Sequence, residues 1–118
     1  MLKRKAESVG YALKGIKIAF QEESNFEIQL VLGVVAIVLG FYLKISTVEW
    51  LFVIGSCGLV LSAELLNTAL EELCDMLKST HDPHVAKIKD LAAGAVLVSS
   101  ITALTVGIVI FLPKLLGL

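Results

Sequence analysis

The sequence predicts an all-α integral membrane protein, in which an N-terminal amphipathic surface helix precedes three transmembrane helices. The chain has 118 residues, so residues 1–118 are expected to form a single domain. Hydrophobic residues make up 57% of it, against about 45–50% in soluble domains, and charged residues make up only 18%. The net charge of -1 provides no basic surface for nucleic acid, and the two cysteines share no metal-binding motif. Composition therefore places the chain in a membrane.

Three apolar stretches are long enough to be transmembrane helices, over about 26–43, 50–70 and 91–112. Each comes close to the roughly 20 residues that a helix needs to cross the ~30 Å hydrocarbon core. A soluble bundle of apolar helices is the alternative, but helices of soluble proteins keep a polar face. Residues 91–112 carry no charge at all, which disfavours the soluble alternative.

Residues 1–24 show a different pattern, with apolar side chains at alternating spacings of four and three. This spacing places them on one face of a helix, and charged side chains fill most of the remaining surface. Such a helix lies in the membrane interface. A plain anchor that binds anionic lipid is its simplest use. The apolar face consists of Leu2, Ala6, Val9, Leu13, Ile16 and Phe20.

The basic residues indicate the orientation. With three spans, the N-terminus and the second connection lie on one side of the membrane, and the first connection and the C-terminus lie on the other. Eight of the 10 Lys and Arg residues fall on the first side, whereas Lys44 and Lys114 fall on the second. The N-terminus is therefore expected in the cytoplasm. In the second connection, Asp82 can cap the following helix, with Pro83 at its first position.

Acidic and amide side chains recur along the cytoplasmic half of the second span. They are Glu64, Asn67, Glu71 and Asp75. At about 100° per residue, these four side chains fall in one narrow stripe of a helix. A carboxylate at the bilayer centre costs about 2.5–3.5 kcal/mol, so the stripe is expected to have a function. The alternative is that it only binds helices together.

Polar groups from two other segments are expected to meet this stripe on the cytoplasmic side. These segments are 21–25 (Gln-Glu-Glu-Ser-Asn) and 87–90 (Lys-Ile-Lys-Asp). Carboxylates from two segments suit Mg²⁺, which takes oxygen ligands and keeps waters and phosphates. A lysine can bind phosphate, and a carboxylate at lipid depth can take the proton of a lipid hydroxyl. These are the parts that phosphoryl transfer requires.

The same motifs carry a family resemblance. Residues 64–75 read Glu-Leu-Leu-Asn-Thr-Ala-Leu-Glu-Glu-Leu-Cys-Asp, and residues 89–97 read Lys-Asp-Leu-Ala-Ala-Gly-Ala-Val-Leu. Together with residues 10–15 and 23–26, they closely resemble the small bacterial membrane lipid kinases of the prokaryotic diacylglycerol kinase and undecaprenol kinase family. The resemblance covers essentially the whole chain.

The resemblance implies a homotrimer with composite active sites between neighbouring subunits at the cytoplasmic interface. It also implies ATP as co-substrate and Mg²⁺ as cofactor. Glu64 resembles the family's general base, with Asn67 beside it, and Glu23 and Glu71 resemble the magnesium ligands that position the nucleotide phosphates. The nucleotide contacts implied are Arg4, Tyr11, Lys89, Asp90 and the connecting-loop residues Thr80, His81 and Asp82.

The expected function is transfer of the ATP γ-phosphoryl group to the hydroxyl of a membrane lipid, undecaprenol or diacylglycerol, in the bacterial inner membrane. The run Ala92-Ala93-Gly94 resembles the undecaprenol kinase branch more than the diacylglycerol kinase branch. Gln29 replaces a carboxylate that the diacylglycerol kinase branch has near the lipid site. One alternative is a proton- or cation-coupled transporter that uses Glu64 as a relay. Another is a non-catalytic assembly protein that packs through the small residues Ala95, Ser99, Ala103 and Gly107.

Overall fold

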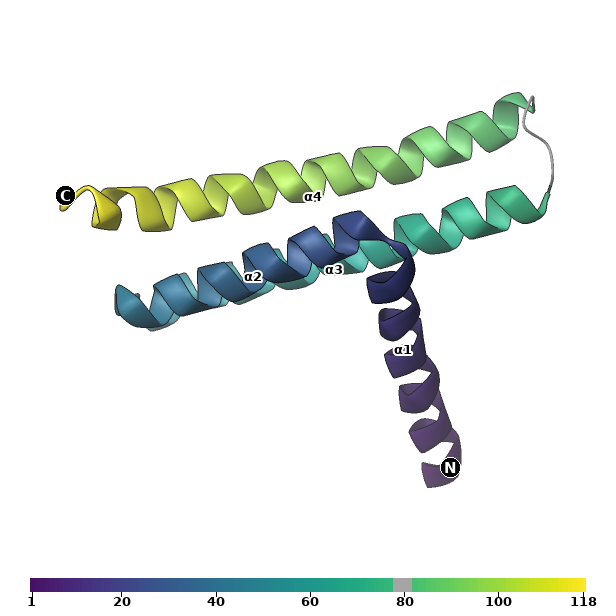
Figure 1. Ribbon diagram of the computed structural model, residues 1–118, viewed down its shortest axis with the longest axis horizontal. Coiled ribbons are helices and arrows are strands. Elements are labelled where there is room, and N and C mark those ends of the chain that lie inside the picture. Colours follow the sequence, from purple (N-terminus) through teal and green to yellow (C-terminus); the bar gives the residue numbers. More distant parts are fainter. Residues whose placement is uncertain (78–81) are drawn as a thin grey trace.

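The computed structural model describes residues 1–77 and 82–118, which form four α-helices. They are α1 (Leu2–Glu22), α2 (Ser24–Tyr42), α3 (Thr47–Met76) and α4 (Pro83–Leu115). Figure 1 shows α2, α3 and α4 lying along one another, with α1 leaving them at a steep angle. The α2–α3 connection and the C-terminus lie together at one end, called the far end below. The opposite end, called the polar end, holds the last turns of α3, the first turns of α4 and the α1–α2 corner.

Among the described residues, three helices are long and apolar enough to cross a membrane, as predicted. They are α2 with 19 residues, α3 with 30 and α4 with 33. At the polar end, α3 and α4 extend past the predicted spans, because α3 continues from residue 70 to Met76 and α4 already begins at Pro83. Each extension is about 9–12 Å long. The candidate site residues on α3 and α4 therefore lie on continuous helix rather than on loops.

The corner between α1 and α2 is a single extended residue, Glu23, with φ -116° and ψ 109°. Its backbone N–H still donates to the carbonyl oxygen of Ala19 at 2.9 Å, which closes the last turn of α1. Ala19 and Phe26 are buried on either side of the corner. These contacts fix the direction in which α1 leaves the spans. A separate N-terminal helix is therefore present at Leu2–Glu22, within the predicted 1–24, and its place at the membrane surface stays a prediction.

The core lies along α3, because α2 and α4 each pack on α3 and, in the described ranges, hardly touch one another. Its best-buried cluster is at the far end. The cluster consists of Ile45, Val53, Ile110 and Phe111. Close packing there requires a glycine, since a Cβ on Gly40 would come within 2.6 Å of Cη2 of Trp50.

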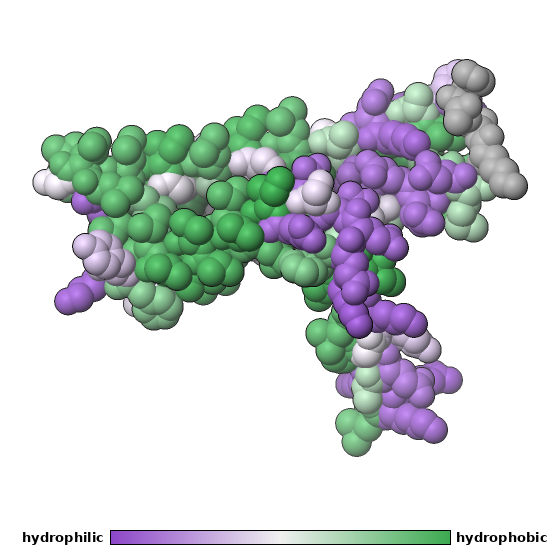
Figure 2. Space-filling model, in the orientation of Figure 1, coloured by the Kyte–Doolittle hydropathy of each residue, from purple (hydrophilic) through white to green (hydrophobic). Residues whose placement is uncertain are grey.

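Polarity divides the molecule along its long axis (Figure 2). The body formed by α2, α3 and α4 is covered with apolar side chains, whereas polar side chains gather at the polar end and along one side of α1. Large apolar side chains remain exposed on the spans, such as Ile54 at 59% and Leu104 at 64%. In a membrane-spanning helix, exposed apolar side chains of this kind face the lipid. At the start of α4, Oδ1 of Asp82 accepts a hydrogen bond from the backbone N–H of His84 at 2.8 Å, which confirms the predicted cap.

Candidate active site

Glu64 is the buried carboxylate of the spans, with a residue exposure of 6%. It lies on α3 between the apolar body and the polar end. Burying a carboxylate is costly unless a ligand or a partner compensates for it. The carboxylates of Glu23 and Glu71 lie close enough to repel its charge. Mutual repulsion at this depth opposes folding, so the arrangement favours a functional explanation over a structural one.

Asn67 joins Glu71 in the centre of the stripe. Its Nδ2 donates to Oε1 of Glu71 at 3.2 Å, one helical turn away. The Oδ1 atom of Asn67 is buried and has no hydrogen-bond partner among the described residues. An unpaired buried acceptor costs about 1–3 kcal/mol. A ligand that donates a hydrogen bond to this oxygen would remove that cost.

Glu23 reaches the stripe from the α1–α2 corner. The corner directs this half-buried side chain toward α3, within electrostatic range of Glu64. Both members of the expected magnesium pair, Glu23 and Glu71, therefore lie within electrostatic range of the same carboxylate. In residues 1–77 and 82–118, no group of three or more His, Cys, Asp or Glu side chains could by itself hold a metal ion. Two carboxylates without a third protein ligand fit a cation that completes its shell with waters and phosphates.

Lys89 and Asp75 connect α4 to the end of the stripe. The Nζ atom of Lys89 donates to Oδ1 of Asp75 at 3.2 Å, and the two side chains are 44% and 67% exposed. The expected meeting of the α4 lysine with the stripe is confirmed. An ion pair this exposed contributes little free energy, so an anionic ligand can displace the carboxylate from the lysine.

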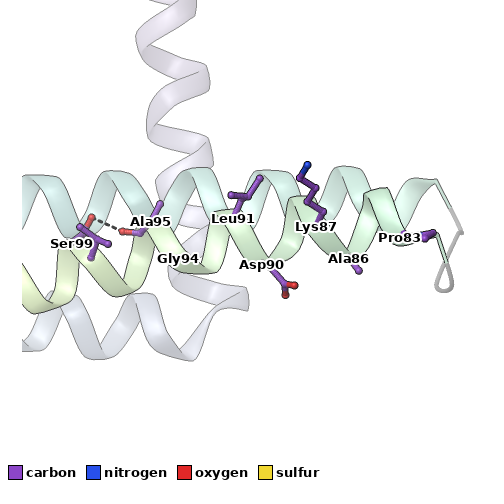
Figure 3. A pocket seen from close by; sticks show the side chains of 9 residues that line it. Pro83, Ala86, Lys87, Asp90, Leu91, Gly94, Ala95 and Ser99 are labelled. Atoms are coloured by element: carbon purple, nitrogen blue, oxygen red, sulfur yellow. Dashed lines mark hydrogen bonds between the residues drawn. The ribbon is translucent and has the colours of Figure 1, made fainter.

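Asp90 lies on a different face of α4 from that contact. It lines a shallow hollow, together with Lys87, whose lining residues all come from α4 (Figure 3). Asp90 and Lys87 are three residues apart, so both lie on the side of α4 that borders this hollow. The structure therefore does not bring Asp90 into the group of Glu23, Glu64 and Glu71 within one chain.

The remaining predicted nucleotide contacts are spread over the chain. Arg4 and Tyr11 are exposed on α1 and lie about 28 Å and 18 Å from the Glu23 corner, measured along the helix. α1 carries them away from the spans (Figure 1), so one chain does not place them beside Glu64. Thr80 and His81 lie outside the described residues.

Two contacts in the site go beyond what the stripe predicts. The hydroxyl of Thr68 donates to the backbone carbonyl oxygen of Glu64 at 2.9 Å, a local bond that the spacing of four residues could have indicated. The choice of Asp75 as the partner of Lys89 depends on how α3 and α4 are rotated against each other. Nothing in an apolar sequence pattern specifies that rotation.

Comparison with known proteins agrees with this geometry. The profile of the family described as prokaryotic diacylglycerol kinase matches residues 10–111. The undecaprenol kinase of Bacillus subtilis (strain 168) is 36% identical over 97% of this chain and 93% of the relative. The diacylglycerol kinase of Pseudomonas aeruginosa is 37% identical over 98% and 91%. The diacylglycerol kinase of Synechocystis sp. is 39% identical over 94% of this chain and 64% of the relative.

The family profile covers nearly all of the spans and all of the acidic stripe. The relatives match over almost the full chain, and all of them carry kinase names. Three helices that can cross a membrane agree with a membrane enzyme. The chain belongs to the prokaryotic diacylglycerol kinase family, and it is a lipid kinase.

Proposed function

We propose that the protein transfers the γ-phosphoryl group of MgATP to the hydroxyl of undecaprenol or diacylglycerol at the polar end of its spans. The observation that carries this proposal is Glu64, a buried carboxylate on α3 where the apolar part of the helix gives way to polar residues. A lipid hydroxyl reaches this level from the membrane. A nucleotide reaches it from the cytoplasm, past Lys89 and Glu71.

The reaction needs one proton acceptor and one phosphoryl acceptor. The carboxylate of Glu64 takes the proton of the lipid hydroxyl, and the oxygen forms a bond to the γ-phosphorus. The bond between the γ-phosphorus and the β–γ bridging oxygen breaks, and ADP leaves with the electron pair. The products are the lipid phosphate, ADP and a proton held on Glu64 that later passes to water.

The residues present fit a magnesium ion. Glu23 and Glu71 supply hard oxygen ligands, and Asn67 fixes the orientation of the Glu71 carboxylate through the 3.2 Å hydrogen bond. When bound, Mg²⁺ neutralises charge on the phosphate oxygens. The unpaired Oδ1 of Asn67 is then free to accept a hydrogen bond from the lipid hydroxyl or from a water.

We propose that the ammonium group of Lys89 releases the Asp75 carboxylate and binds a nucleotide phosphate in its place. The ammonium group offers three donors and a positive charge, and the exposed pair with Asp75 costs little to break. Asp90, Asp82, Thr80 and His81 remain proposed nucleotide contacts. For Asp82 a structural role is already established, because it caps α4.

A homotrimer with shared sites is proposed from the position of α1. This helix carries Arg4 and Tyr11 away from the acidic group of its own chain. If both residues contact the nucleotide, they must do so in the site of a neighbouring subunit. The charge bias supports the proposal that the N-terminus and the site lie on the cytoplasmic side of the bacterial inner membrane.

The transporter alternative fits the geometry less well. Transporter sites lie near the bilayer midplane, where half-helices break. Here α3 and α4 run without a break through the described residues, and the charges gather at one end. The family names also favour the kinase.

Phosphate transfer from labelled MgATP in mixed micelles tests the proposal. Undecaprenol and diacylglycerol are assayed in parallel, with Glu64→Gln as the control protein. We expect label in at least one lipid with the wild type and none above background with the control, and the preferred lipid names the substrate. Absence of label in both lipids, from folded and trimeric wild-type protein, would contradict the proposal.

A further inference from the structure

The far end of the spans carries an aromatic corner, formed by Phe41, Tyr42 and Trp50. The ring centroids of Phe41 and Trp50 are 4.9 Å apart, with an interplanar angle of 55°. The Trp50 ring also packs against Gly40, where a Cβ would come within 2.6 Å of it. Tyr42, in contrast, is 79% exposed. Tryptophan and tyrosine combine an apolar ring with one polar group, and they are enriched where a membrane meets water.

A lysine occupies the turn that follows this corner. Lys44 is exposed and has φ 52°, a left-handed conformation in which glycine is the usual residue. The backbone N–H of Ile45 closes the turn by donating to the carbonyl oxygen of Gly40 at 3.2 Å. Glycine would suit this backbone better than lysine does, so the lysine side chain is expected to contribute in another way. An ammonium group beside exposed aromatic rings can bind the phosphates of lipid headgroups.

Three helices give nearly the same apolar length between the far end and the polar end. Trp50 and Glu71 lie about 32 Å apart along α3. Tyr42 and Glu23 lie about 28 Å apart along α2. On α4, the uncharged residues 91–113 extend over about 33 Å. These lengths match the hydrocarbon core of a membrane, which is about 30 Å thick. With Tyr42 and Trp50 at one boundary, Glu23 and Glu71 therefore lie at the other.

Glu64 lies at a different depth from the two other carboxylates. It is about 21 Å from Trp50 along α3 and about 10 Å short of Glu71. The same arithmetic places Glu64 about 10 Å inside the hydrocarbon core. Ile28 on α2 marks this depth on the outside of the molecule, because it is also about 21 Å from Tyr42 and its side chain is 55% exposed.

We propose that Tyr42, Lys44 and Trp50 anchor the far end in one membrane surface, and that this anchor holds Glu64 inside the hydrocarbon core. The partner of the anchor is the headgroup layer of a phospholipid membrane. Its three members are positioning residues, because they set the depth at which Glu64 meets a lipid hydroxyl without touching the reactants. This positioning role rests on the proposed function, whereas the depths themselves do not.

Fluorescence quenching measures the depths without turnover. Trp50 is the only tryptophan of the chain, so its emission reports one position. The protein is reconstituted into phosphatidylcholine vesicles whose acyl chains carry bromine at a series of depths. We expect Trp50 to lie about 15 Å from the bilayer centre, where the shallowest bromines quench most strongly. In the double variant Trp50→Phe/Ile28→Trp, the introduced tryptophan should lie about 5 Å from the centre, and deep bromines should quench it most strongly.

Kinetics in the same vesicles test the positioning role. The double variant Tyr42→Ala/Lys44→Gly removes two exposed side chains and gives the turn the residue that its backbone favours, so the fold should persist. We expect the KM for the lipid alcohol to rise about threefold, since a small change in depth costs a fraction of a kcal/mol per Å. The KM for MgATP should stay unchanged, because the nucleotide arrives from water.

Two further variants separate anchoring from a general loss of side chains. Phe52→Ala is the matched control, because Phe52 is an exposed aromatic residue two positions farther into the span than Trp50. It should change neither KM. The conservative double variant Tyr42→Trp/Lys44→Arg keeps an amphipathic ring and a charge at the corner, so it should retain the wild-type KM for the lipid.

The outcomes distinguish this inference from the proposed function. Strongest quenching of Trp50 by deep bromines would overturn the anchor, and equally shallow positions for both tryptophans would overturn the depth assigned to Glu64. An unchanged KM for the lipid in Tyr42→Ala/Lys44→Gly, or an equal rise in Phe52→Ala, would overturn the positioning role and leave the kinase intact. The expected depths in a protein that phosphorylates neither undecaprenol nor diacylglycerol would support the anchor and contradict the proposed function.

Discussion

At the far end of the spans, Glu49 is surrounded by partners, whereas at the polar end Glu64 is surrounded by other carboxylates. The Glu49 carboxylate accepts from the backbone N–H of Ser46 at 2.9 Å and pairs with Nζ of Lys114 at 3.4 Å. The Ser46 hydroxyl in turn accepts from the backbone N–H of Glu49 at 3.2 Å. Glu64 is buried within reach of the negative charges of Glu23 and Glu71.

The difference shows two uses of the same side chain. At the far end, Ser46 and Glu49 form a capping box, in which each side chain accepts a hydrogen bond from the backbone N–H of the other. The charge of Glu49 is also compensated by Lys114, so this side chain connects the start of α3 to the end of α4. At the polar end, the Oδ1 atom of Asn67 has no partner among the described residues, and the neighbouring carboxylates have like charges. A ligand can therefore donate a hydrogen bond to Oδ1, and a cation can bind the carboxylates. Substitutions should therefore affect stability at the far end and chemistry at the polar end.

The largest effect is expected from Glu64→Gln. This substitution keeps the shape of the side chain and removes the proton acceptor, so kcat should fall by about 10²–10⁴-fold. The affinity for MgATP should persist, because the proposed partner of Glu64 is the lipid hydroxyl and not the nucleotide. Turnover and titration with a fluorescent nucleotide check the two parts. Loss of nucleotide binding would mean that Glu64 is a ligand instead of a base.

The magnesium pair should give the next largest effect. Glu71→Gln and Glu23→Gln each remove one hard oxygen ligand, so the Mg²⁺ concentration for half-maximal activity should rise about tenfold or more. Glu72→Gln is the control, because Glu72 is an exposed neighbour that does not belong to the stripe. Unchanged magnesium titrations for both residues would remove them from the metal site.

Lys89→Met should raise the KM for ATP about tenfold, in line with the loss of one charge-assisted hydrogen bond to phosphate. Lys87→Met provides the matched control, since Lys87 precedes Lys89 by two residues and therefore lies on another face of α4. If both variants shift the KM equally, the effect comes from the general positive charge of α4 and not from the contact that Lys89 makes.

At the far end, Gly40→Ala should reduce stability and leave the kinetic constants alone. The added methyl group would press against the Trp50 ring at 2.6 Å, and overpacking of this kind costs about 1–3 kcal/mol. Gly55→Ala, with open space around the new methyl group, should be neutral. Thermal unfolding in detergent compares the two. Equal stability of the two variants would show that Trp50 moves aside freely.

Much of the fold follows from local patterns. Hydropathy is sufficient to predict the three spans, and the spacing of apolar residues in α1 is sufficient to predict a surface helix. The cap formed by Asp82 follows from its position before Pro83. The four stripe residues share one face because helical periodicity requires it.

Tertiary contacts could not be predicted in the same way. The pairing of Lys89 with Asp75, and the separation of Asp90 from the acidic group, depend on the rotation of α4 against α3. When helices are apolar on nearly every side, hydrophobic periodicity does not fix that rotation. The apolar groove that α2 and α4 leave open over α3 depends on the same rotation. The sequence shows Ala103 and Gly107 as a small-residue face, but not what lies against them.

The most direct test of the contrast between the two ends compares Glu64→Gln with Glu49→Ala in one experiment, measuring lipid phosphorylation and thermal unfolding on the same preparations. Glu64→Gln should lose turnover and unfold at the same temperature as the wild type or higher, because a buried charge is removed. Glu49→Ala should keep turnover and unfold at a lower temperature, because it removes both the capping box and the ion pair with Lys114. Retained turnover in Glu64→Gln, with a loss of stability instead, would contradict the account.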